Sequence, residues 1–188
     1  MSRPRLEAYA IVGDDDRIAD AAGLMPDALR NEADWAYFQA ALDRADGILI
    51  GRASHEATPN VRGRRRLVLS RSARGLVERP DGWWWNPARA PWPEVVGRLG
   101  LAGRRIAVPG GQAAFDAALA LGLDAFHLSR MPGVTLPGGR GVFAAVEDGR
   151  SADAVLRAAG LAPGAPLLLD REAGVTVTVY QRGEPRPI

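Results

Sequence analysis

The chain has 188 residues, of which 47% are apolar and 24% charged. This length predicts a single domain, and the absence of Cys excludes disulfides, thiolate metal sites and a cysteine nucleophile. All 24 basic residues are Arg, which also excludes a P-loop lysine, a Schiff-base lysine and a lysine general base.

The net charge is only +2, although the pI is about 9.6. Arg does not titrate in this range, so the high pI reflects the missing Lys rather than a strongly basic surface. We therefore expect no nucleic-acid partner. The first apolar run is too short for a signal peptide or a membrane span, which predicts a soluble cytoplasmic protein with no membrane partner.

Short apolar runs alternate with helical patterns along the chain. Strands are predicted at Leu6–Val12, Gly47–Ile50, Leu67–Ser70, Trp83–Trp85, Arg105–Val108, Ala125–Ser129, Leu167–Leu169 and Val175–Gln181. Helices are predicted at Glu32–Ala45, Trp92–Leu99, Gln112–Leu121 and Ala152–Ala159, with Gly122 and Gly160 as C-terminal caps.

Strands that alternate with helices predict an α/β fold, with a mostly parallel sheet covered on both faces. The last two strands, on either side of the turn at Asp170–Gly174, are expected to form an antiparallel hairpin at the edge. In such sheets ligands bind outside the carboxyl ends of the strands. Candidate functional residues should therefore follow the predicted strands.

Three short motifs occupy such positions: Gly51-Arg52-Ala53-Ser54, Ser70-Arg71-Ser72 and Pro109-Gly110-Gly111, which precedes Gln112. Glycine allows a ligand to approach the backbone, helix N-termini favour anions, and Arg adds charge. Each motif taken singly is also typical of an ordinary turn. Their occurrence at one edge of one sheet predicts a phosphate-bearing cofactor.

Asp34 begins an apolar stripe on the first predicted helix, followed by Phe38, Ala41 and Ala45. One interpretation is a first-turn acid that complements the helix dipole, with Asn31 as the N-cap. The other is a partly desolvated carboxylate with a raised pKa that faces a ligand pocket.

The basic run at 62–66 enters a strand, so Arg64 and Arg66 should point to one face and Arg65 to the other. A solvated rim and the recognition of one anion are both consistent with this run. The Trp83-Trp84-Trp85 triplet is interpreted as a core strand with one exposed ring. His55 and His127 lack partners at ligand spacing and are interpreted as structural.

Taken in order, these motifs resemble the dihydrofolate reductase superfamily, from Leu6 to about Phe143. The resemblance is carried by the first strand, Met25-Pro26, Asp34 with Tyr37-Phe38, Gly51-Arg52-Ala53-Ser54, Gly63-Arg64-Arg65, Pro109-Gly110-Gly111 with Phe115, and Phe126-His127-Leu128-Ser129. It implies one three-layer domain over residues 1–188, with an eight-stranded sheet, a C-terminal antiparallel hairpin and about four helices. Three positions depart from the family pattern, at Asp27, His55 and Pro109.

The resemblance implies NADPH-dependent reduction of dihydrofolate or a related pterin-like heterocycle, by a monomer or a homodimer without a metal. The implied catalytic residues are Asp34 and Ser129. The implied cofactor-binding residues are Gly51, Arg52, Ser54, Ser70, Arg71, Gly110, Gly111 and Gln112. The implied substrate-binding residues are Ala10, Met25, Phe38, Arg64 and Pro109.

Two alternatives stay open. One is a riboflavin-pathway-like reductase of a ribosylaminopyrimidine phosphate, because the departures affect the substrate more than the cofactor. The other is a non-catalytic protein on the same fold that binds NADPH or nucleic acid.

Overall fold

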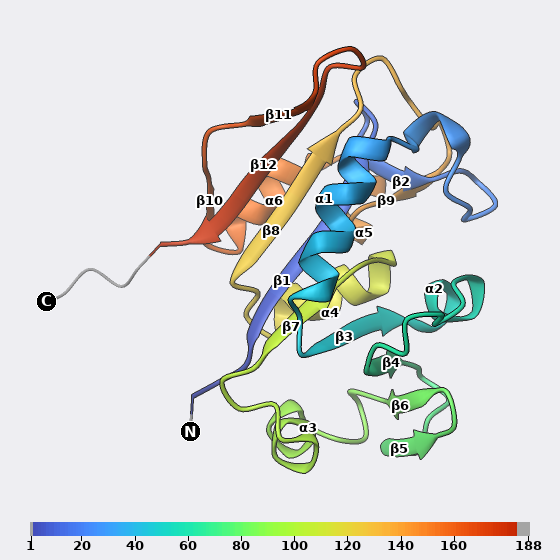
Figure 1. Cartoon of the computed structure of the whole chain (residues 1–188), viewed down its shortest axis with the longest axis vertical. Coiled ribbons are helices and arrows are strands. Elements are labelled where there is room, and N and C mark those ends of the chain that lie inside the picture. The colour runs from blue at the N-terminus through green and yellow to red at the C-terminus, as the bar shows by residue number, and fades with distance from the viewer. Residues whose placement is uncertain (1, 184–188) are drawn as a thin grey trace, which may run out of the picture.

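The computed structural model describes residues 2–183 and contains a large β-sheet, helices on both of its faces, and a small two-stranded sheet (Figure 1). The strands are β1 (Arg5–Val12), β2 (Arg17–Ala19), β3 (Gly47–Gly51), β4 (Arg66–Leu69), β5 (Leu76–Arg79), β6 (Gly82–Trp85), β7 (Arg105–Val108), β8 (Ala125–Arg130), β9 (Arg140–Gly141), β10 (Leu161–Pro163), β11 (Leu167–Asp170) and β12 (Val175–Arg182). The helices are α1 (Glu32–Asp43), α2 (Arg52–Ala57), α3 (Trp92–Leu99), α4 (Gln112–Ala120), α5 (Ala144–Glu147) and α6 (Ala152–Ala158), and the 3-10 helix η1 (Asp27–Leu29) precedes α1.

The large sheet has the strand order β10-β12-β8-β1-β7-β3-β4-β6-β5, and β11 also pairs with β12. The central pairs from β8 to β6 are parallel, whereas β5, β10, β11 and β12 pair antiparallel. The predicted mostly parallel sheet and its antiparallel C-terminal hairpin are confirmed. No membrane-spanning helix is found in the described part of the chain.

All eight predicted strands and all four predicted helices are present, with ends within two residues of the expected ones. Gly122 and Gly160 have φ values of 86° and 80°, as expected just after a helix. The predicted numbers of elements were wrong: within residues 2–183 the large sheet has ten strands rather than eight, and there are six α-helices rather than about four. The two missed strands of the large sheet, β5 and β10, contain only two consecutive apolar residues each, which is too weak a pattern to predict a strand.

The two faces of the sheet carry separate parts of the core. Ala8 and Val12 of β1 join a large cluster with residues of α3, α4 and α6, whereas Tyr9 joins a second cluster beneath α1. Figure 1 shows α1 on one side of the sheet and α4, α5 and α6 on the other. The side chains of Asp34 and Phe38 therefore belong to the face of the sheet that α1 covers.

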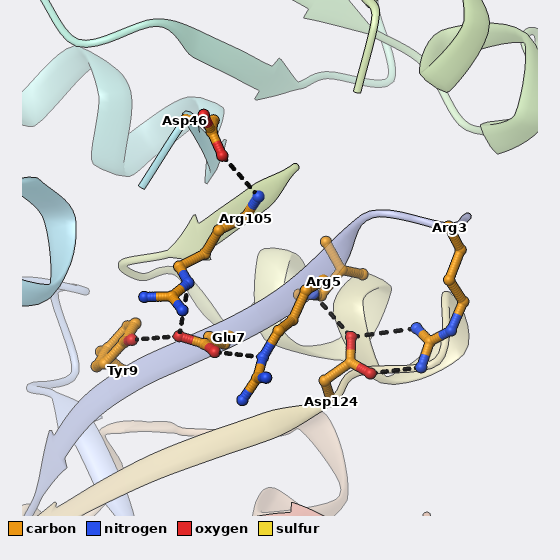
Figure 2. A network of polar contacts seen from close by, with 8 residues as sticks. Arg3, Arg5, Glu7, Tyr9, Asp46, Arg105 and Asp124 are labelled. Carbon is orange, nitrogen blue, oxygen red and sulfur yellow. Dashed lines mark hydrogen bonds and ion pairs between the residues drawn. The ribbon is translucent and has the colours of Figure 1, made fainter. Parts of the chain in front are cut away.

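A polar network fixes the amino end of β1 (Figure 2). The buried Glu7 accepts a hydrogen bond of 2.9 Å from the Tyr9 hydroxyl and lies 2.6 Å from the Nε atom of Arg5. Asp124 accepts 2.8 Å from the backbone of Leu6 and binds the guanidinium of Arg3. Because this network is at the opposite end of β1 from the predicted cofactor motifs, we assign it a structural role.

The carboxyl end of β1 is closed by the loop that contains Asp16, which has a positive φ of 60°. Asp16 is buried, pairs with Arg130 at 2.6 Å and accepts 2.8 Å from the backbone of Ala152. Arg130 also donates 3.0 Å to the carbonyl of Gly13. The ends of β1 and β8 are thereby tied to each other and to α6.

Candidate functional site

The turns that follow β3 and β7 lie against each other. A Cβ atom at Gly111 would stand 3.0 Å from the Ser54 hydroxyl oxygen and 3.8 Å from the Cα atom of Gly51, and Gly111 has a φ of 86°. Only glycine combines this φ with so close an approach at no steric cost. Gly51 and Gly111 also begin α2 and α4, and neither helix start is capped by a side chain.

The loop after β4 is the third predicted motif, and a buried asparagine shapes it. The side-chain amide of Asn86 donates 2.8 Å to the carbonyl of Arg71 and 3.0 Å to that of Ala73. The hydroxyls of Ser70 and Ser72 lie 2.9 Å apart within the loop. Asn86 was missed by the sequence analysis; its position directly after the Trp83–Trp85 strand was the available signal.

Pro109 and Gly110 leave backbone polar groups free between these turns. The carbonyl of Pro109 and the N–H of Gly110 make no hydrogen bond to any described residue. Gln112, a predicted cofactor ligand, instead donates 3.1 Å to the carbonyl of Gly141 and 2.7 Å to Glu147. Its side chain therefore anchors α4 to the neighbouring segment, and only its backbone belongs to this edge.

Asp34 lies in the first turn of α1, beside Ser129 of β8. Asn31 is the N-cap, and its side chain accepts 3.0 Å from the Asp34 backbone and donates 2.7 Å to Asp170. Burial raises the pKa of the Asp34 carboxyl, and the adjacent Ser129 hydroxyl opposes part of this rise. The structure thus supports both interpretations of Asp34, since it is a first-turn acid and also a half-buried carboxyl next to a buried hydroxyl.

Two aromatic contacts hold α1 on the sheet near Asp34. The Tyr37 hydroxyl lies 2.6 Å from Nδ1 of His127, and the His127 ring stacks on Tyr9 with centroids 4.4 Å apart. Burial lowers the pKa of His127 to about 4, so the ring is neutral at physiological pH. Asp34 and Tyr37 are three residues apart and share one face of α1, so these contacts also position Asp34.

The predicted substrate-binding residues Ala10, Phe38 and Met25 do not all lie together. Ala10 is partly buried on β1, opposite Leu128 of β8, and the Phe38 ring lies 6.5 Å from that of Tyr9. Met25 is 46% exposed in the loop before η1. Phe38 therefore lies beneath α1, whereas Ala10 packs on the opposite face of the sheet and Met25 is on the surface, so the structure does not bring these three side chains together.

Arg64, the predicted clamp for a substrate carboxylate, already has partners on α1. Its Nη2 atom donates 2.9 Å to the side chain of Gln39 and also binds the Asp43 carboxylate. Its Nε atom is buried without a hydrogen-bond partner among the described residues. Arg65 donates to the carbonyl of Leu99 on α3, so the predicted division of this run between the two faces is confirmed.

The residues at the carboxyl edge are chemically suited to a phosphate-bearing cofactor. The turns that carry Gly111 and Ser54 are in close contact, and the hydroxyl of Ser54 makes no hydrogen bond to the described residues. Arg71 is exposed, and Arg52 has only an exposed partner, Glu56 at 3.6 Å. Free amides, hydroxyls and guanidinium groups are the donors that phosphates require.

Comparisons with known proteins identify the fold but not the family. No protein-family model and no curated protein matches this sequence. Among solved structures, a dihydrofolate reductase from Enterococcus faecalis complexed with NADP(H) and RAB-propyl has a TM-score of 0.66 at 15% identity, covering 97% of this chain and 99% of that chain.

Two further solved structures are similar to this chain over nearly its whole length. A putative riboflavin biosynthesis protein from Shewanella sp. PV-4 has a TM-score of 0.63 at 18% identity, covering 96% of this chain and 99% of that one. A pyrimidine reductase-like protein from Corynebacterium diphtheriae has a TM-score of 0.67 at 14% identity, covering 97% and 93%. The chain therefore has the dihydrofolate-reductase-like fold, as the sequence motifs indicated.

Proposed function

We propose that this protein is an NADPH-dependent reductase of dihydrofolate or a related pterin-like heterocycle. The observation that carries the proposal is the half-buried Asp34 carboxyl beside Ser129. Ser129 lies on β8, in the same sheet whose strands β3 and β7 end at the glycine turns of Gly51 and Gly111. Ser129 and the β7 turn are separated by β1 alone, which is about 10 Å at two strand spacings. A small heterocycle spans such a distance.

The cofactor would be held by the carboxyl-edge residues. The glycines at 51, 110 and 111 let the backbone amides approach phosphate oxygens, and the hydroxyls of Ser54 and Ser70 add further donors. Arg52 and Arg71 are the cations available for the additional phosphate of NADPH. When bound, the nicotinamide supplies the hydride for reduction of a C=N bond.

Asp34 would bind the N–H groups of the heterocycle and support protonation of the nitrogen next to the carbon that is reduced. A raised pKa suits this role, because a carboxyl that titrates nearer to neutral pH holds and releases a proton more readily. The Ser129 hydroxyl fixes the position of the carboxyl. The free carbonyl of Pro109 is an acceptor for a substrate amino group, and this acceptor survives the loss of the N–H in proline.

The ion pair of Arg64 favours a second candidate. A folate substrate ends in a carboxylate that would need the Arg64 guanidinium, but that group is bound to Asp43 and Gln39. A ribosylaminopyrimidine phosphate does not need this planar clamp. The riboflavin-pathway-like reduction is therefore the alternative, with the same cofactor residues and the same Asp34.

The test is NADPH oxidation followed by absorbance, with dihydrofolate, the tail-less dihydropterin and the ribosylaminopyrimidine phosphate supplied in parallel. Turnover of either pterin supports the proposal, and turnover of the pyrimidine alone selects the alternative. NADPH binding without turnover of any of them would instead support a non-catalytic protein. Absence of NADPH binding contradicts the assignment of the carboxyl edge.

A further inference from the structure

A cavity of about 660 Å³ lies at the amino ends of β4 and β6. Its walls come from α2, from the loop between α2 and β4, and from the turn between β5 and β6, elements that lie together in Figure 1. No residue of α1 lines it. Arg66 at the cavity wall begins β4, and Ser70 of the predicted cofactor loop directly follows this strand. The two residues are therefore about 13 Å apart.

Arg66 is the principal charge in this cavity. Arg66 is only 8% exposed. In the part of the chain that the structure describes, no carboxylate oxygen lies within 4.0 Å of its guanidinium. A buried charge without a counter-charge is costly. The guanidinium of Arg66 is not fully enclosed, because its nitrogens without a hydrogen-bond partner remain accessible. An anion that enters the cavity would supply the missing counter-charge.

The orientation of Arg66 leaves one edge of its guanidinium open. Its Nη1 atom donates 2.8 Å to the carbonyl of Thr58 and 3.1 Å to Nδ1 of His55. The Nε and Nη2 atoms make no hydrogen bond to residues 2–183. These two groups form the side of a guanidinium that binds two oxygens of one carboxylate or phosphate in parallel.

His55 positions that guanidinium. Since its Nδ1 accepts from Arg66, its Nε2 carries the proton and donates 2.9 Å to Asp81. Asp81 also accepts 2.9 Å from the indole of Trp84. The Asp81–His55–Arg66 chain is thus complete, and it fixes Arg66 without bringing a carboxylate into contact with it.

The two acidic side chains at the cavity wall do not fill the role of counter-ion. Asp81 is occupied by His55 and Trp84, and Glu56 lies 3.6 Å from Arg52. Arg64 and Arg65 also line the cavity; Arg64 is paired with Asp43, and neither Arg65 nor Arg66 has an acidic partner among the described residues. The cavity has the volume of a small-molecule site, for which 300–1,000 Å³ is roughly the usual range.

We propose that this cavity is a second ligand site, in which the free Nε/Nη2 edge of Arg66 binds the oxyanion of a small phosphate- or carboxylate-bearing molecule. The site shares Arg64 with the predicted substrate-binding residues, and no predicted catalytic or cofactor-binding residue lines it.

The test is a titration of the ¹⁵N-labelled full-length chain with inorganic phosphate, and separately with acetate, observed by NMR. We expect saturable shifts of the backbone amides of Gly82 and Trp83, with the two ligands showing whether phosphate or carboxylate is preferred. Phosphate that binds at the cofactor edge would shift the Gly110 and Gly111 amides instead. Shifts confined to those glycines would overturn the proposal.

Variants assign the binding to Arg66. Arg66→Met should weaken phosphate binding at Trp83 by about tenfold or more, the usual loss for a charged hydrogen-bonded pair. Arg62→Gln removes one positive charge from the same loop but lies outside the cavity, and should change the affinity less than about twofold. If Arg66→Met does not fold, Arg66→Lys keeps the charge without the fork and should still weaken binding several-fold. Equal affinities in wild type and the Arg66 variant would overturn the proposal.

Discussion

Gly111 and Ser54 come from turns 57 residues apart in the sequence, yet a Cβ atom at Gly111 would stand 3.0 Å from the Ser54 hydroxyl oxygen. This contact joins the turn after β7 to the start of α2. It is the geometric basis for placing a phosphate-bearing cofactor at this edge.

Gly111→Ala should therefore destabilise the protein and lower its affinity for NADPH. Gly122→Ala is the matched control, because Gly122 has the same φ of 86° but no atom within 4 Å of its Cβ position. Both variants place Ala at a positive φ, but Gly111 has a ψ of 123° and lies outside the left-handed helical region, so Gly111→Ala should lose more stability, and only this variant adds a contact at the site. Urea unfolding and NADPH titration measure the two effects. If the two variants bind NADPH equally well, the contact between Gly111 and Ser54 does not contribute to cofactor binding.

Cofactor choice should depend on Arg71 and Arg52. A charge-assisted contact to the additional phosphate of NADPH contributes about 1.5–3 kcal/mol, so NADPH should bind about ten- to a hundredfold more tightly than NADH. Arg71→Gln should reduce this preference. Arg74→Gln, which changes an exposed arginine of the same loop, should leave it intact. The measurement is the dissociation constant of each nucleotide for the wild type and both variants. Equal values for NADPH and NADH in the wild type contradict the assignment of Arg52 and Arg71 to the additional phosphate.

Asp34→Asn should slow reduction at neutral pH by about a hundredfold or more while leaving NADPH affinity nearly unchanged. The residual rate should rise as the pH falls, because protonation of the substrate from solvent replaces part of the role of the carboxyl. The NADPH affinity of the variant is the control, because it should not change. If the variant keeps the wild-type turnover at pH 7, Asp34 is only a first-turn acid that complements the helix dipole.

The same variant tests the raised pKa of Asp34 through stability. Since the folded-state pKa lies above the unfolded one, the folded state holds more protons between the two values. The free energy of unfolding should then fall with rising pH across this window in the wild type, relative to Asp34→Asn. Urea unfolding from pH 3 to pH 8 measures the difference, and parallel curves would show that the carboxyl is not desolvated.

Arg64 separates the two substrate candidates. Arg64→Lys removes the two-pronged grip on a carboxylate, so it should weaken dihydrofolate binding about tenfold and leave the tail-less pterin unaffected. Asp43→Asn frees the guanidinium and should strengthen dihydrofolate binding if Arg64 is the clamp. Affinities of both ligands for both variants provide the measurement. If neither variant separates the ligands, the folate assignment is weakened in favour of the pyrimidine.

His127 should make the protein sensitive to acid. Its pKa of about 4 in the fold lies below the ordinary histidine value of 6.5, so the unfolded state binds the extra proton between these values. Stability is complete above pH 6.5 and should fall by up to about 3 kcal/mol as the pH decreases to 4. His127→Gln should lack this component, with urea unfolding at pH 7 and pH 4.5 as the readout. An equal acid loss in both proteins would refute the burial of a neutral ring.

Much of the fold could be predicted because its information is local. The eight predicted strands were recognised from local apolar runs or alternation and the four predicted helices from their hydrophobic period, and Gly122 and Gly160 mark helix ends whatever the rest of the chain does. The position of Asp34 at the head of an apolar stripe is local in the same sense. Elements as short as β9 or α5 have too few residues to show a period.

The candidate site was predicted as a set of separate strand ends, and the tertiary structure decided how they meet. Contacts such as Gly111 with Ser54, Asn86 with the Arg71 loop, and Arg64 with Asp43 join residues far apart in sequence, so they depend on strand order and helix placement. The missing counter-charge of Arg66 is likewise a property of its surroundings. Sequence determines which groups can act, whereas packing of distant segments determines which of them are neutralised by a neighbour and which remain free to bind.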